Sequence, residues 1–171
     1  MRDLAAEAAV SFATPFNQFG SKAAIMQALS GRRIDTMIGR FAAAPPLPDA
    51  AGRVLLAIDT AVAVMLEEPD VNRAVMGWIG TSGPAPGQVM AHSKTLWTLA
   101  LGDGEGLSAT RREEALRRLP RQLAFAFRGV LSFWAAGELP DELLGPSARE
   151  IACNLLLGFA PGLSERNDAA I

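Results

Sequence analysis

The sequence predicts an all-α protein. Ala, Leu, Glu and Arg dominate its amphipathic segments, and the period-two alternation that marks half-buried strands is absent. Gly and Pro recur between helix-length stretches, as expected for breaks between helices. Half of the 171 residues are hydrophobic, so the chain can form one sizeable helical domain with a small appendage.

Three helices are predicted before residue 42. Their spans are Met1–Ala8, Ser11–Gly20 and Ser21–Phe41. Ser11 and Ser21 have the side-chain oxygen that an N-cap requires. The Pro-rich stretch AAAPPLPD, residues 42–49, then interrupts the helical pattern. We therefore expect a first module at residues 1–41 and a second domain at residues 47–171.

The second domain reads as further helices separated by Gly-rich and Pro-rich breaks. Their predicted spans are Asp49–Leu66, Asp70–Gly80, Gln88–Leu101, Thr110–Pro120, Pro120–Gly137 and Ser147–Phe159. Thr110 with Glu113, and Ser147 with Glu150, form capping boxes that predict two of these starts. Pro120 is expected to end or kink its helix, because proline lacks the N–H that a helix interior uses.

Composition restricts the class of protein. The net charge of −2 excludes a strongly basic protein that coats nucleic acid, although a local basic face is compatible with it. The only cysteine, Cys153, excludes a disulfide framework and favours a reducing cytoplasm. The N-terminus lacks a secretory signal, and the apolar run Val54–Leu66 is too short for a bilayer span. A soluble, cytoplasmic protein is expected.

No catalytic or metal-binding pattern is found. His92 is the only histidine and has no ligand spacing around it, and neither a G-x-S-x-G elbow nor a phosphate-binding loop occurs. DGEG, residues 103–106, is predicted to be a turn. The Arg-rich segment TRREEALRRLPRQ is expected to pair with its own acids, Glu114 with Arg118 for example, at i,i+4 spacing. The sequence thus predicts neither an enzyme nor a cofactor nor a metal site.

The stretch VSFATPFNQFGSK, residues 10–22, carries the most information. A short helix, a tight corner at Val10 and a second short helix followed by a longer one are the order of a DNA-binding helix-turn-helix. Phe16 and Phe19 would face inward, while amides and hydroxyls at the start of the second helix can contact base edges. Lys22 can meet a phosphate. The predicted DNA-binding residues are Ser11, Phe12, Thr14, Pro15, Phe16, Asn17, Gln18 and Lys22.

This stretch resembles the tetracycline-repressor (TetR) family of bacterial regulators. The matching residues are Ala9-Val10-Ser11, Thr14-Pro15-Phe16, Asn17-Gln18-Phe19 and Gly20-Ser21-Lys22, followed by AAIMQAL. The segment MRDLAAEA before them is similar to the family's second helix. The resemblance covers about the first quarter of the chain. Phe16 stands where the family has a tyrosine whose hydroxyl meets a phosphate, and the family's first helix has no counterpart before Met1.

The resemblance implies a ligand-responsive transcriptional regulator, by family habit a repressor. It implies a homodimer whose two N-terminal modules read a palindromic operator until a small-molecule effector releases them. Because the first helix is missing from the match, we expect the module as written to be loosely folded and to bind DNA weakly or not at all. The alternative from another class is a ligand-binding and dimerisation module that has lost DNA binding through N-terminal truncation.

Large apolar residues of the second domain can form core or line an effector pocket. Met is suited to pockets because it deforms around varied ligands. Met76 and Phe127 belong to this wider group. The residues predicted to bind ligand are Met65, Trp78, Met90, His92, Trp97 and Phe125.

The last two long helices carry broad apolar stripes. A broad stripe can pack inside the monomer on one side and against a partner on the other. We therefore expect a two-fold dimer through a four-helix bundle, the alternative being a larger monomer core. The stripe residues are Leu123, Phe127, Val130, Leu131 and Trp134, then Ile151, Leu155, Leu156 and Phe159.

Overall fold

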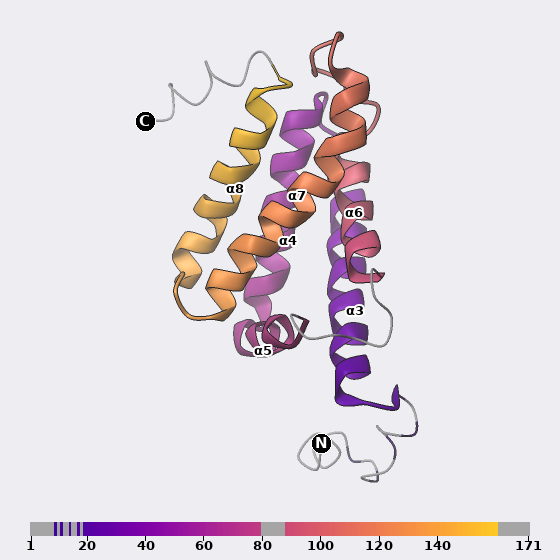
Figure 1. The fold of residues 1–171 in the computed structure, drawn as a ribbon, viewed down its shortest axis with the longest axis vertical. Helices are drawn as coiled ribbons and strands as arrows, with labels where there is room; N and C mark the ends of the chain where they lie inside the picture. The colour runs from indigo at the N-terminus through magenta and orange to yellow at the C-terminus, as the bar shows by residue number, and fades with distance from the viewer. Residues whose placement is uncertain are drawn as a thin grey trace.

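The computed structural model describes Ala9, Ser11, Thr14, Asn17 and residues 19–79 and 88–160. In this part of the chain every regular element is a helix, as predicted (Figure 1). The helices are α3 (Lys22–Ala43), α4 (Ala50–Glu67), α5 (Pro69–Ile79), α6 (Gln88–Leu101), α7 (Arg112–Ala135) and α8 (Asp141–Leu157).

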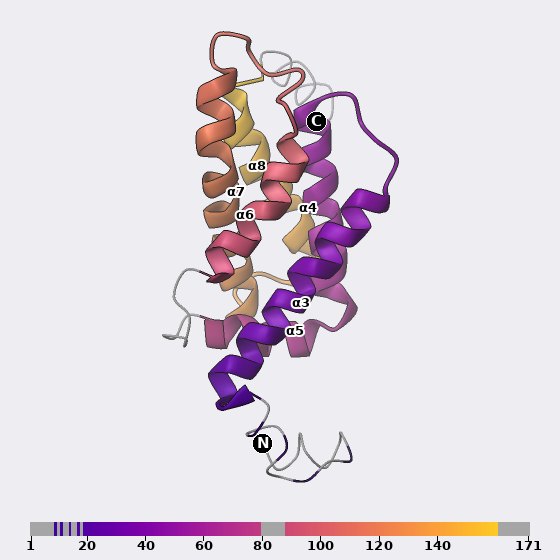
Figure 2. The ribbon, with the colours of Figure 1, turned by 90° about the vertical axis from the view of Figure 1, so that its right-hand side faces the viewer.

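Four of these helices, α4, α6, α7 and α8, form a bundle along the long axis of the molecule (Figures 1 and 2). Helix α3 packs along one side of the bundle and contacts α4, α5 and α6. The short α5 lies across the lower end and also contacts α7. The long helix of the expected N-terminal module is therefore packed on the second domain. None of the described helices has both the length and the apolar character that a bilayer crossing requires.

Two helix starts have side-chain caps, and the sequence predicts the one at Ser21. The Ser21 side chain accepts a hydrogen bond from the backbone N–H of Ala24 at 3.1 Å, and Asp49 accepts one from Gly52 at 2.8 Å. Each cap satisfies a donor that the first helical turn leaves without a backbone partner. The predicted span Gln88–Leu101 is also confirmed.

Two predicted helix starts, at Pro120 and at Ser147, are wrong. Helix α7 continues through Pro120, and α8 begins at Asp141 and continues through Pro146, so Ser147 does not start a helix. A proline removes one backbone hydrogen bond from a helix. Pro120 lies on the buried face of α7.

The capping box at Thr110 is also wrong. The N-cap of α7 is Arg111, which makes no side-chain capping bond, and Thr110 Oγ1 instead lies 3.0 Å from Ser108 Oγ. Asp70 likewise belongs to the first turn of α5 rather than preceding it. In contrast, the predicted pair of Glu114 with Arg118 is confirmed, at 3.0 Å.

The segment GDGEG forms the predicted turn and packs on the start of α4. The backbone N–H of Ala50 donates to the Glu105 carbonyl at 2.7 Å. The Arg53 guanidinium donates to the carbonyls of Ala100 and Leu101, at 3.0 and 2.8 Å, and to the Glu105 carboxylate. This turn thus fixes the end of α6 to the start of α4.

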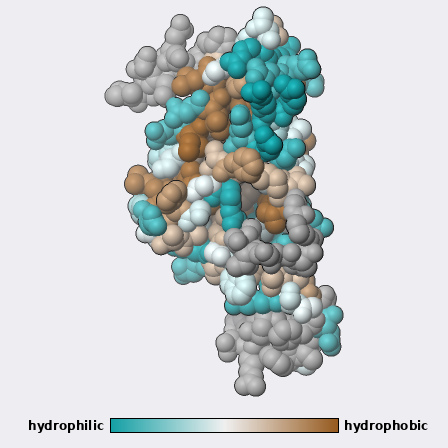
Figure 3. Space-filling model, in the orientation of Figure 1, coloured by the Kyte–Doolittle hydropathy of each residue, from teal (hydrophilic) through white to brown (hydrophobic). Residues whose placement is uncertain are grey.

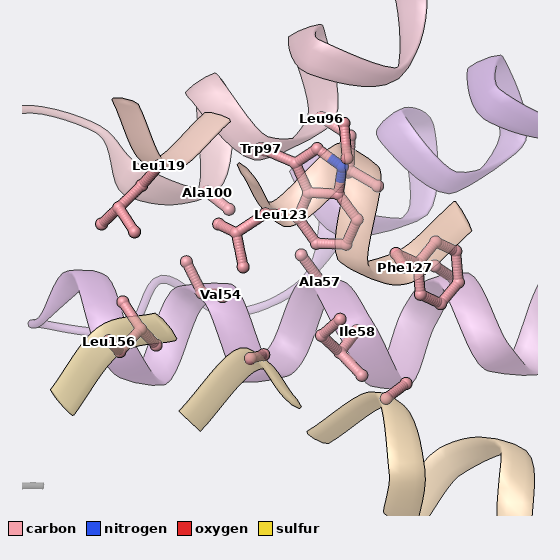
Figure 4. Packing of buried hydrophobic residues seen from close by; sticks show 14 of the residues in the cluster. Val54, Ala57, Ile58, Leu96, Trp97, Ala100, Leu119, Leu123, Phe127 and Leu156 are labelled. Carbon is pink, nitrogen blue, oxygen red and sulfur yellow. The ribbon is translucent and has the colours of Figure 1, made fainter. Parts of the chain in front are cut away.

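The core lies between α4, α6, α7 and α8. Val54, Ala57 and Ile58 of α4 point toward Leu123 and Phe127 of α7 (Figure 4). Trp97 is fully buried, and its ring meets that of Phe127 edge to face, with centroids 5.6 Å apart. The predicted α7 stripe is entirely buried within the monomer, and of the predicted α8 stripe only Ile151 is exposed.

Candidate ligand-binding site

A cavity lies where α3, α5, α6 and α7 meet, with one residue from α4. The centre of a water-sized sphere can occupy about 60 Å³ of it, several times the roughly 10–15 Å³ that a single water needs, so the surrounding side chains leave an unfilled space. Most of its wall is apolar and adaptable, because three methionines contribute to it. The principal apolar residues are Met37, Met65, Val75, Met76, Trp97 and Phe127.

Asn72 fixes one polar side of this cavity. The side chain is almost fully buried, and its amide nitrogen donates to the carbonyls of Val64 and Met65, at 3.3 and 2.8 Å. Its oxygen accepts from Arg33 Nε at 3.0 Å. Arg33 also pairs with Glu68. The charge of Arg33 is therefore compensated, and both ends of the Asn72 amide are satisfied.

Arg128 of α7 presents a different situation on the same cavity. It is half-buried, and its hydrogen bonds within the described residues go to Met76 alone, to the carbonyl at 3.3 Å and to the sulfur at 3.6 Å. No carboxylate among these residues lies within ion-pair distance of it. Burial lowers the pKa of the Arg128 guanidinium, because desolvation disfavours the charged form. Arginine nevertheless stays charged at neutral pH.

A second donor on the wall has no partner. The indole N–H of Trp97 is buried, and no hydrogen-bond acceptor lies near it in the part of the chain that the structure describes. Buried polar groups in proteins are almost always paired, so such an exception indicates strain, a ligand or a bound water. Among the described residues, the cavity thus combines apolar walls with a guanidinium that has no anionic partner and an indole N–H that has no partner.

Of the six residues predicted to bind ligand, the structure brings Met65 and Trp97 to this cavity. Met90 instead packs against the outside of the core. Phe125 lies on the outer face of α7, 55% exposed, with Arg121 above its ring. Phe125 therefore does not line this cavity, contrary to the prediction. Each step along a helix turns by about 100°, so Phe125, two positions before the lining residue Phe127, points to roughly the opposite side of α7.

Trp78 and His92 lie outside the main cavity. Trp78 is 38% exposed, and the Lys22 ammonium lies 4.4 Å from the centre of its ring. Lys22 is predicted to contact DNA and Trp78 to bind the ligand, but the two side chains contact each other. Their contact joins the start of α3 to the end of α5. His92 lines a smaller hollow between α3 and α6, and its Nε2 lies 2.8 Å from Asp35 Oδ1.

Four of the predicted DNA-binding residues are described. Thr14 and Asn17 are helical, and the backbone N–H of Thr14 donates to the Ser11 carbonyl at 3.0 Å. Ser11, Asn17 and Lys22 are exposed. Phe12, Pro15, Phe16 and Gln18 lie outside the described residues.

Sequence reasoning missed the contribution of α3 and of Arg128. Ser30, Arg33, Ile34 and Met37 line the cavity from α3, which the sequence assigns to the N-terminal module. Arg128 had a detectable signal, because it follows Ala124 by four residues and precedes Leu131 by three. A lone arginine within an apolar helix stripe indicates a charge directed at a core or pocket.

The outer faces of α7 and α8 form an apolar surface (Figure 3). Gly129 lies between two exposed phenylalanines on α7, and a Cβ built on it meets no atom within 4 Å. The exposed large apolar residues of these two helices are Phe125, Phe133, Leu143, Ile151 and Leu157.

Comparison with known proteins yields no relative. No family model, no curated protein and no solved structure matches the chain. In the described part of the chain, no group of three His, Cys, Asp or Glu residues is placed to hold a metal ion. A functional assignment therefore depends on the chain's own residues and on the cavity.

Proposed function

We propose that the chain is a ligand-responsive, DNA-binding transcriptional regulator of TetR type, a repressor that a small apolar ligand releases from its operator. The residue order of 10–22 supports the DNA-binding half of this proposal. The observation that carries the whole is the position of α3. This helix begins directly after the proposed reading segment, at the Ser21 cap, and it also forms one wall of the cavity.

Helix α3 supplies a physical route between ligand and DNA. Ser30, Ile34 and Met37 recur at the helical spacing that puts them on one face, toward the cavity. A ligand that binds more tightly when α3 is in one position than in another shifts the protein toward the first position. The difference between the two affinities sets how large this shift can be. Lys22 over Trp78 and His92 against Asp35 are the contacts that such a shift would break or tighten.

Dimerisation completes the proposal. The outer apolar surface of α7 and α8 offers two phenylalanines separated by a glycine that permits close approach. A two-fold axis through this surface would pair the same helices of two copies, and it would place two reading segments on one DNA molecule.

The test is direct measurement of DNA binding. Operator fragments selected from a random pool by the purified protein are assayed by fluorescence anisotropy over a range of salt concentrations. Asn17→Ala should weaken binding to the selected sequence by at least tenfold, since one good base contact is worth about 1–3 kcal/mol. Thr98→Ala, at an exposed position of α6 outside the proposed reading segment and the proposed dimer surface, is the control and should bind as the unchanged protein does.

A DNA-binding regulator also loses affinity steeply as salt rises, because phosphate contacts release counterions. Selection that yields no enriched sequence would contradict the proposal and favour the second candidate, a ligand-binding module without DNA activity. What supports that candidate is that, among the described residues, those that form the core and line the cavity lie between 25 and 160.

A further inference from the structure

The charge of the cavity restricts the chemistry of its ligand. Among the described lining residues, the two cations are Arg33 and Arg128. Glu68 neutralises Arg33, and no described acid pairs with Arg128. The connecting residues 80–87, GTSGPAPG, contain no Asp or Glu. Within the part of the chain that the structure describes, the site therefore carries one uncompensated positive charge.

The surroundings of Arg128 are unfavourable for a charge that has no anionic partner. Its two partners are a neutral carbonyl oxygen and a thioether sulfur, which is a weak acceptor, and a guanidinium has five donors to satisfy. Apolar side chains such as Phe127 and Leu131 line the cavity beside it. A charge in such surroundings is stabilised most by an anion that forms hydrogen bonds with it.

We propose that the ligand of this cavity is a small apolar carboxylic acid, whose carboxylate binds Arg128 and whose hydrocarbon body contacts Met65, Met76 and Phe127. The planar guanidinium matches a carboxylate in a two-pronged pair. One net positive charge matches a monoanion, whereas a phosphate monoester carries a charge of about −1.5 to −2. The inference rests on the proposed function only in treating the cavity as the ligand site.

Trp97 gives an independent reason for an acceptor on the ligand. Its buried indole N–H lacks a partner among the described residues, on the same cavity wall. A ligand with oxygen acceptors can satisfy this donor as well, whereas a hydrocarbon or an amine cannot. Arg128 and Trp97 belong to different helices, α7 and α6, so an acid that binds both would hold these helices together.

The experiment uses two matched pairs of probes, octanoate with octanol and phenylpropanoate with phenylpropanol. Their affinities are measured by isothermal titration calorimetry on the full chain at neutral pH. At least one acid should bind at least tenfold more tightly than its alcohol. Arg128→Gln should remove that preference, reducing acid affinity at least tenfold while leaving alcohol affinity unchanged. Arg117→Gln, an exposed arginine on the same helix, should change neither.

Arg128→Lys, which keeps the charge, should retain part of the preference, and circular dichroism confirms that each variant is folded. The inference would be overturned if acid and alcohol bound with equal affinity or if neither acid bound. It would also be overturned if Arg117→Gln lost as much acid affinity as Arg128→Gln. DNA release is measured separately with the same acids. Arg128-dependent binding to a protein that recognises no operator would uphold this inference while overturning the proposed regulator.

Discussion

Gly106, in the turn before α7, cannot be replaced without cost. Its φ is +81°, and a Cβ built on it would lie 2.8 Å from Asp49 Cβ. Asp49 is the cap of α4, so the added carbon would press on a residue with a defined role. We expect Gly106→Ala to lower the free energy of unfolding by about 1–3 kcal/mol, which is the usual cost of a strained backbone position. Urea unfolding followed by circular dichroism measures it.

Gly39 provides the matched control for this substitution. It lies within helical α3, and a Cβ there meets no atom within 4 Å. Alanine has the higher helix propensity, so Gly39→Ala should stabilise the protein by about 0.5–1 kcal/mol. A Gly106→Ala variant as stable as Gly39→Ala would show that the turn adapts without strain.

Glu105, in the same turn, makes stability depend on pH. A backbone hydrogen bond and then the Arg53 guanidinium lower the pKa of this carboxyl below its ordinary value. A lowered pKa in the folded state stabilises the protein above the ordinary value, and the contribution disappears as the pH falls through the folded-state pKa. Glu105→Gln should therefore reduce Tm slightly at neutral pH and not at all in strong acid.

Thermal unfolding from about pH 7 down to about pH 2 measures this difference between Glu105→Gln and the unchanged protein. The effect should be small, because Glu105 is exposed and solvent screens its charge. A Tm difference that stayed constant across the range would mean that the charge of Glu105 does not contribute to it.

Asn72 is the residue at which three helices are joined. It lies on α5, receives a hydrogen bond from Arg33 of α3 and donates to two carbonyls at the end of α4. Asn72→Ala leaves these buried groups without partners, each unpaired group costing about 1–3 kcal/mol. We expect a loss of at least about 2 kcal/mol in the free energy of unfolding, measured by chemical denaturation. Asn154→Ala, at an exposed position of α8, should change stability by less than about 0.5 kcal/mol.

Helix spans were predictable where local signals act alone. The cap at Ser21 and the span of α6 follow from side chains within one turn of the helix end. At Pro120 the helix continues, and Pro120 lies on the buried face of α7. At Ser147 the predicted start failed because the helix begins earlier, at Asp141, and buries Leu144 before it reaches Ser147. Whether a proline ends a helix depends on the packing around it, which a single sequence does not contain.

The candidate site was predictable only in part, for a geometric reason. Met65 and Trp97 were identified from their residue types. A choice between Phe125 and Phe127 depends on how α7 is rotated about its axis, and the sequence alone did not give that rotation. The α3 wall could not be foreseen, because the Pro-rich stretch at residues 42–49 suggested a boundary between modules. The structure shows a turn there across which α3 and α4 pack together.

The apolar surface of α7 and α8 leads to a prediction for the whole molecule. If it forms the proposed dimer interface, a buried charge there should separate the copies. Phe133, 58% exposed, is the test position, and Phe133→Glu should convert a dimer into a monomer at micromolar concentration, as measured by light scattering after gel filtration. Val71→Glu, an exposed apolar position on α5, should remain dimeric. A monomeric unchanged protein would contradict the interface.

The contact of Lys22 with Trp78 gives the protein an optical property. Of its three tryptophans, Trp97 and Trp134 are fully buried, whereas Trp78 is partly exposed. Iodide can reach the Trp78 ring and not the other two, so collisional quenching separates its emission from theirs. Because Lys22 begins α3, any movement of that helix changes how much of the Trp78 ring the ammonium shields. The intensity that iodide quenches is thus an intrinsic measure of the position of α3 that needs no attached dye.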